Sequence, residues 1–154
     1  MGVSTDGQIC YGVLFDEDYE FPWIVDGDND VDTWWRNKHG FTHSFELYDS
    51  EGNYLNGVNP SKEQISAYYA EERSFDAANP LPVEVVNYCS CDFPMYILAV
   101  PSSTKSARRG YPEEFDPAKL TVTEQEKADL LKFCEENGLA FVKGPAWFLS
   151  SLWC

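Results

Sequence analysis

The densest group of chemically capable side chains in the sequence is a run of carboxylates near its start. Positions 16–32 hold eight acidic residues and no basic residue. Four of these acids alternate along the chain, and they are Asp26, Asp28, Asp30 and Asp32. Alternating carboxylates can point oxygen ligands at Ca²⁺ or Mg²⁺, but Val31 stands where a calcium loop needs glycine, and Asn37 where it needs a bidentate glutamate. The pattern therefore favours a solvated acidic loop, with a cation site as the weaker alternative.

A second possible metal site combines the two histidines with two of the cysteines. His39 and His43 are four positions apart, and together with Cys89 and Cys91 they would supply the ligands of a Cys2His2 zinc site. We expect Gly40 to end the helix that would align the two imidazole rings, and a C-x-C pair is a less usual zinc spacing than C-x-x-C. A surface histidine pair near a helix end is the better interpretation.

Motifs for covalent or phosphate chemistry are absent from the sequence. It contains no G-x-S-x-G elbow, no local cysteine–histidine signature and no glycine-rich phosphate loop. We therefore expect no catalytic residue and no cofactor, and a binding protein rather than an enzyme. A metal-dependent enzyme of another class is the alternative, with a pocket lined by Asp30, His39, His43 or Cys89.

The cysteines and the apolar segments bear on where the protein acts. The five cysteines are Cys10, Cys89, Cys91, Cys134 and Cys154. Their odd number and irregular spacing predict reduced thiols that fill the core. The first residues lack the basic and apolar regions of a signal peptide, and no apolar run of about 18 residues occurs. These features predict a cytoplasmic protein that does not enter a membrane.

The net charge of −15 restricts the class of partner. A surface this acidic repels nucleic acids and anionic membranes, so the natural electrostatic partner is a basic protein. The basic residues cluster only at Lys105, Arg108 and Arg109, in a segment (101–117) that reads as a long exposed loop. This cluster is expected to counter a neighbouring acidic loop, and binding of a phosphate or an acidic patch is the alternative.

The elements that must position these residues follow from hydrophobic patterning and from capping signals. Strands are predicted over 8–15, 42–48 with a partner at 54–55, 83–88, 95–100 and 139–142, and the apolar tail from 144 is predicted to dock as a last strand or extension. Helices are predicted over 31–39, from a cap at Asn59 or Ser61 to about 72, and over 124–137. This order favours a single α+β domain over residues 1–154, with an antiparallel or mixed sheet of about five to six strands and two to three helices.

Several segments resemble a known group of viral proteins. The stretches DFPMYILAVPSS, RRGYPEEF and GPAWFLSSLWC, and the early Tyr11-Gly12-Val13, are similar to a loose family of small uncharacterised bacteriophage and prophage proteins. The resemblance covers about half of the chain and carries no motif tied to chemistry. It implies a virus-encoded accessory protein that acts in the bacterial cytosol. Anti-restriction and anti-CRISPR inhibitors of this size are similarly compact, acidic and non-enzymatic.

Charge and resemblance together predict a binding protein that inhibits a host defence protein, or another host protein, by occupying its basic, nucleic-acid-binding surface. A virion or morphogenesis accessory protein is the alternative. The residues expected to contact the partner are Asp16, Glu17, Asp18, Glu20, Asp26, Asp28, Asp30, Asp32 and Trp34.

Overall fold

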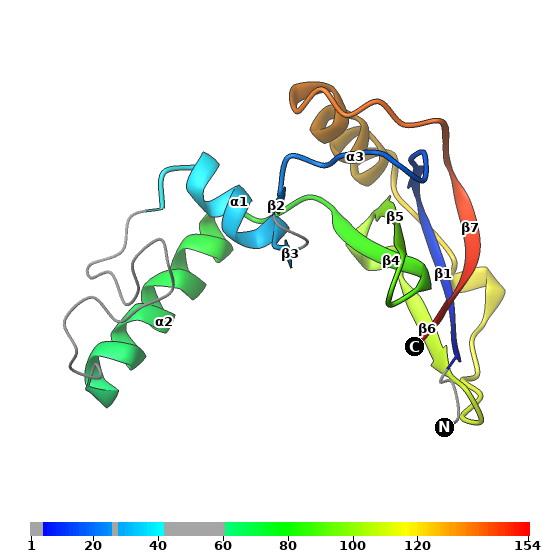
Figure 1. Cartoon of the computed structure of the whole chain (residues 1–154), viewed down its shortest axis with the longest axis horizontal. Coiled ribbons are helices and arrows are strands. Elements are labelled where there is room, and N and C mark those ends of the chain that lie inside the picture. Colours follow the sequence, from blue (N-terminus) through cyan, green and yellow to red (C-terminus); the bar gives the residue numbers. More distant parts are fainter. Residues whose placement is uncertain (1–4, 26–27, 42–60) are drawn as a thin grey trace. The chain divides into compact units, whose positions relative to one another are not determined.

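The computed structural model describes residues 5–25, 28–41 and 61–154 (Figure 1). The chain groups into two compact units. One, here called the sheet unit, comprises Met1–Pro22 and Pro82–Cys154; the other, the helical unit, is Trp23–Leu81. Over the described residues the fold is α+β, with a five-stranded mixed sheet and three α-helices, as the sequence predicted. The single-domain organisation stays a prediction.

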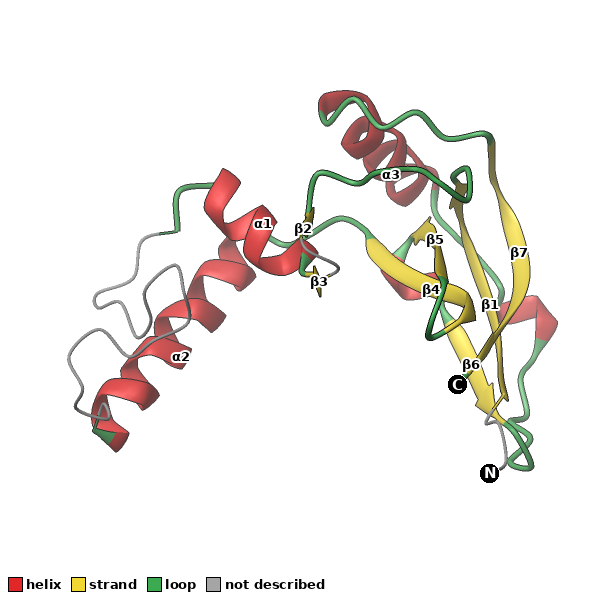
Figure 2. Cartoon of the chain, in the orientation of Figure 1, coloured by secondary structure: helices red, strands yellow, loops and turns green. Residues whose placement is uncertain are grey.

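The strands of the sheet unit form a nearly closed arrangement (Figure 2). They are β1 (Thr5–Leu14), β4 (Glu84–Ser90), β5 (Pro94–Ala99), β6 (Lys105–Arg108) and β7 (Lys143–Trp153). Their order is β5-β4-β7-β1-β6, and β5 also pairs with β1, so the pairings run in a circuit through β1, β5, β4 and β7. All pairs are antiparallel except the short one between β4 and β7. The apolar tail thus docks as the last strand, as expected.

The core of the sheet unit follows the two-residue alternation of its strands. Its central cluster comprises Cys10, Val86, Ile97 and Ala99, and Leu14, Tyr88 and Phe148 pack against it. Helix α3 (Glu124–Glu136) adds buried apolar side chains. A capping box starts this helix: Thr123 accepts a hydrogen bond from the Glu126 N–H, and Glu126 accepts one from the Thr123 N–H. Hydrogen bonds from Ser102 and Thr123 lower the pKa of Glu126.

β1 passes close to β5 at Gly12. A Cβ atom at Gly12 would collide with the carbonyl oxygen of Leu98 and would lie 2.9 Å from the Cα atom of Ala99. The pairing of β1 with β7 also shifts register between Gly12 and Leu14. Gly12 therefore lies both next to a bulge and at a close approach between two strands, where the absence of a side chain is required.

The helical unit contains a small hairpin and two helices. The hairpin pairs β2 (Ile24–Val25) with β3 (Asp28–Asn29), and the helices are α1 (Val31–Lys38) and α2 (Lys62–Ala78). The two helices are joined by Arg36, whose guanidinium lies 2.9 Å from a Glu72 oxygen and 2.7 Å from an Asp76 oxygen. This pairing raises the pKa of Arg36 and lowers that of Asp76, chiefly through the hydrogen bonds between the two side chains.

Helix α2 begins at its predicted cap but ends later than expected. Ser61 is the cap, and it forms a capping box with Gln64, whereas the end predicted near residue 72 is wrong, because the helix continues to Ala78. Residues far earlier in the sequence hold this last part of the helix: Asp76 accepts two hydrogen bonds from Arg36, and Phe75 packs against the ring of Phe41. No helix within the described ranges has both the length and the apolarity needed to cross a bilayer.

Three further predictions are corrected or untested. The segment predicted as a loop over 101–117 contains the short 3-10 helix η1 (Pro101–Ser103), strand β6 and a second 3-10 turn, η2 (Pro117–Lys119). The strand predicted over 139–142 does not form, because the Leu139 and Ala140 N–H groups bond to the Cys134 carbonyl and the Tyr19 hydroxyl, and β7 begins only at Lys143. The hairpin predicted over 42–55 lies outside the described residues.

The expectation of five reduced cysteines is wrong for two of them. Cys91 and Cys154 form a disulfide, with their Cα atoms 5.1 Å apart. The parallel pairing of β4 with β7 brings these positions together at the point where the strand circuit closes. Cys10 and Cys134 are free and buried, and burial raises the pKa of each thiol to about 11. The third free thiol, Cys89, is half-buried.

Thiol counting tests this cysteine assignment. In denaturant without a reductant, the unfolded protein should release the equivalent of three thiols to a chromogenic disulfide reagent, and of five after reduction. In the native protein Cys89 should react first, because Cys10 and Cys134 are both buried and protonated at neutral pH. Five reactive thiols in the unreduced, freshly purified protein would show that the Cys91–Cys154 bond does not form.

Candidate functional site

The first four acids of the predicted set form one exposed loop directly after β1. This acidic loop contains Asp16, Glu17, Asp18 and Glu20, whose side chains all face solvent. The loop turns tightly, because the Tyr19 N–H donates to the Asp16 carbonyl at 3.1 Å, and the Glu17 N–H donates to the Asp16 carboxylate. Within the described ranges, none of the four carboxylates takes part in an ion pair. Their charges are therefore available to a partner.

An aromatic cluster anchors the acidic loop to the sheet. The rings of Phe15, Tyr19 and Phe21 contact one another with centroids 4.7–4.8 Å apart, and Phe21 also meets Tyr96 of β5 edge to face at 5.6 Å. The Tyr19 hydroxyl accepts a hydrogen bond from the Ala140 N–H at 3.2 Å. These contacts fix the acidic loop at three places: at Phe15 before it, at Tyr19 within it and at Phe21 after it.

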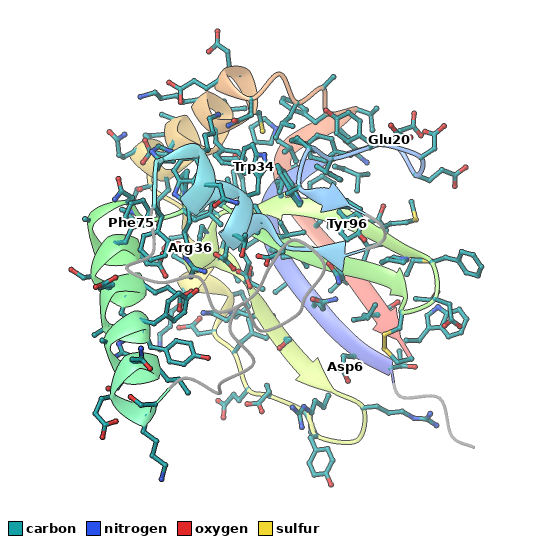
Figure 3. The ribbon with its side chains drawn as sticks, turned by 60° about the vertical axis from the view of Figure 1, so that its left-hand side comes forward. Asp6, Glu20, Trp34, Arg36, Phe75 and Tyr96 are labelled. Atoms are coloured by element: carbon teal, nitrogen blue, oxygen red, sulfur yellow. A yellow bond between two sulfur atoms is a disulfide. The ribbon has the colours of Figure 1, made fainter. Side chains whose placement is uncertain are left out.

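The anchor determines where the carboxylates point. Phe21 is only 4% exposed, and burial raises the pKa of Tyr96. Glu20, the residue before Phe21, extends away from the ribbon into solvent (Figure 3). Four negative charges within five consecutive positions, held by a buried apolar base, produce a local negative potential that a flexible tail of the same composition would spread over a larger volume.

The later acids of the predicted set belong to the helical unit. Asp30 is the N-cap of α1, where its carboxylate accepts a hydrogen bond from the Thr33 N–H at 2.8 Å. Asp32 is exposed in the first turn of the same helix. Asp26 lies outside the described residues, and only the backbone of Asp28 is described. The structure therefore brings together the first half of the predicted acidic set.

Trp34, the predicted aromatic contact, is half-buried within the helical unit. Its ring lies 5.2 Å from that of Trp23, and the Lys38 ammonium lies 5.2 Å from its centroid. Trp35 points elsewhere and donates from its indole N–H to the Asn79 carbonyl. The two adjacent tryptophans thus serve different packing contacts, as expected of neighbours on one helix, and a binding role for Trp34 stays a prediction.

The described residues contain no group of three or more His, Cys, Asp or Glu side chains arranged to hold a metal ion. Of the residues in the hypothetical zinc site, Cys91 is bonded to Cys154 in the disulfide. The His39 ring packs against the Trp35 ring, with their centroids 4.0 Å apart. His43 lies outside the described residues, as does part of the alternating acidic segment. The side chain of Asp30 is already used as a helix cap.

The basic cluster forms an element that the sequence analysis missed. Lys105 and Arg108 begin and end β6, which pairs with the start of β1. The K-S-A-R stretch gives little strand signal, because Ala107 is its one apolar residue and turn-forming residues flank it on both sides.

Comparison with known proteins adds no assignment. No protein-family model matches the chain, and neither a curated protein nor a solved structure matches it.

Proposed function

We propose that the protein is a non-enzymatic binding protein that inhibits a bacterial host protein, such as a defence protein, by placing its acidic loop on a basic, nucleic-acid-binding surface. The observation that carries the proposal is the anchored acidic loop: four exposed carboxylates, unpaired within the described residues, on a base of packed aromatic rings. The net charge of −15 also favours a basic partner.

Pre-organisation gives the acidic loop an advantage over a flexible acidic segment. Because the aromatic anchor already fixes the backbone, little conformational entropy is lost when the loop binds. The negative potential would attract a basic partner from a distance, so association should be fast at low ionic strength and slower in high salt. These are the properties required of a protein that competes with nucleic acid for a basic surface.

The test neutralises the acidic loop without changing its size. A variant carrying D16N, E17Q, D18N and E20Q should associate about tenfold more slowly with the partner at low salt, and its rate should depend less on salt. The partner is first captured from bacterial lysate with the unaltered protein at low salt, identified by mass spectrometry and purified. Association rates are then measured at several ionic strengths.

A charge-matched variant serves as the control. E63Q, E71Q, D92N and E135Q remove the same net charge from exposed positions elsewhere, and Glu113 is kept because it lines an apolar groove. If the control slows association as much as the loop variant, net charge and not the acidic loop steers binding. If neither variant changes the rate, or if no basic partner is captured, the proposal is wrong.

A further inference from the structure

A cavity of about 280 Å³ lies between β4 and β7 in the sheet unit. Among the described residues these two strands pair only where positions 89–90 of β4 meet positions 152–153 of β7. Before those positions, β4 pairs with β5 and β7 pairs with β1, but β4 and β7 do not pair with each other. The cavity therefore occupies an opening in the wall of the strand circuit.

All four strands of the circuit contribute apolar side chains to the cavity. Leu14 of β1 and Ile97 of β5, which pair with each other, line it together with Tyr88 of β4 and Phe148 of β7. Ile97 belongs to the central core cluster, and the other three pack against that cluster. The cavity is thus an apolar extension of the core, and a mostly apolar hollow at the mouth of a barrel-like sheet is typical of a small-molecule site.

The lining also holds one buried polar atom that lacks a partner. The Ser150 Oγ of β7 is buried and has no hydrogen-bond partner among the described residues. A hydroxyl can donate and accept, and leaving it unpaired away from water is unfavourable. A bound molecule with a single hydrogen-bonding group would satisfy this atom.

Charge excludes ions from the cavity. Its lining contains no carboxylate, ammonium or guanidinium group. Burial, followed by the neighbouring Cys89 and Glu17, raises the pKa of Tyr88, so its hydroxyl stays protonated at neutral pH. Lys143, which pairs with Leu14, is exposed and is not part of the lining. An ion would lose its hydration on entry without gaining an opposite charge in the wall, so an uncharged molecule fits best.

We propose that the cavity between β4 and β7 binds a small uncharged molecule that has an apolar body and one hydrogen-bonding group. The apolar body lies against Leu14, Ile97 and Phe148, and the polar group forms a hydrogen bond with the Ser150 hydroxyl. This site is separate from the acidic loop and does not depend on the role proposed for that loop.

The probe is p-cresol, titrated into the isotope-labelled full chain and followed by amide NMR shifts. We expect saturable shifts at positions 14, 88–89, 97 and 148–151, and slower reaction of the Cys89 thiol, which also lines the cavity, with a chromogenic disulfide reagent. Toluene has the same body without the hydroxyl and should bind about three- to tenfold more weakly. The charged analogues p-toluate and 4-methylbenzylammonium should not shift these positions.

The variant S150A tests the hydrogen bond. It should bind p-cresol and toluene with equal affinity, because it keeps the apolar walls and loses the hydroxyl. The matched control S106A, altered at an exposed serine of β6 outside the cavity, should keep the preference for p-cresol. Amide spectra of the free variants establish that each is folded.

Four results would overturn the proposal. The first is an absence of saturable shifts with p-cresol up to its solubility limit, and the second is a set of shifts confined to another surface, such as positions 7–9 and 105–115. The third is equal binding of p-cresol and toluene by the unaltered protein, which would contradict the hydrogen bond to Ser150. The fourth is binding of either charged analogue as tightly as p-cresol, which would contradict the selection of an uncharged molecule.

Discussion

Replacing Phe21 with alanine is expected to lower the free energy of unfolding by about 3–5 kcal/mol. The ring is almost wholly buried and contacts Phe15, Tyr19 and Tyr96, so its removal leaves a cavity beneath the acidic loop. The four carboxylates remain, but their backbone loses its anchor. Association with a basic partner should therefore weaken even at temperatures where the variant is still folded.

Chemical denaturation measures the change in stability, with Phe93→Ala as the matched control. Phe93 lies in the same unit but is 80% exposed, and its truncation should change the free energy of unfolding by less than about 0.5 kcal/mol. Equal losses for the two variants would contradict the aromatic anchor. A destabilised Phe21 variant that binds with an unchanged rate would show instead that the loop needs no anchor to function.

The substitution Gly12→Ala should also be severe, with a loss of about 2–3 kcal/mol. The new methyl group would collide with the backbone of β5 at Leu98 and Ala99, which cannot move aside as a flexible side chain would. Either β1 and β5 separate or the bulge between β1 and β7 is displaced. Both changes disturb the strand circuit around Cys10 and Ile97.

Gly7→Ala is the control on the same strand. Its methyl group meets no neighbouring atom, and alanine loses less backbone entropy on folding than glycine, so stability should be unchanged or rise slightly. Thermal unfolding of the two variants, side by side with the unaltered protein, checks the contrast. A Gly12 variant as stable as the Gly7 variant would refute the close approach of β1 to β5.

Local signals predicted much of this fold. The capping boxes at Ser61 and Thr123 depend on residues three positions apart, so the sequence places these helix starts without knowledge of the rest of the chain. The β7 strand was predicted because an apolar tail is unfavourable in water. In each case the physical cause lies within a few residues or in composition.

Other features depend on contacts that sequence patterning does not reveal. The last turn of α2 is held by Arg36, 40 positions before Asp76. The Cys91–Cys154 bond depends on the pairing of β4 with β7. An odd number of cysteines does not reveal that pairing. The candidate site shows the same limit: one continuous acidic run divides between two units, and Asp30 becomes a helix cap.

The pairing of β1 with β7 has a consequence for how the protein is made. Ile9 pairs with Leu149, some 140 positions later, whereas α1 and α2 are joined within the intervening segment. During synthesis the local contacts of the helical unit can form early. β1, in contrast, stays unpaired with β7 until the ribosome has made residues 143–153. Such late, non-local closure slows folding and leaves strand edges open to aggregation. Expression yield should therefore respond more to chaperones and synthesis rate than the final stability alone would suggest.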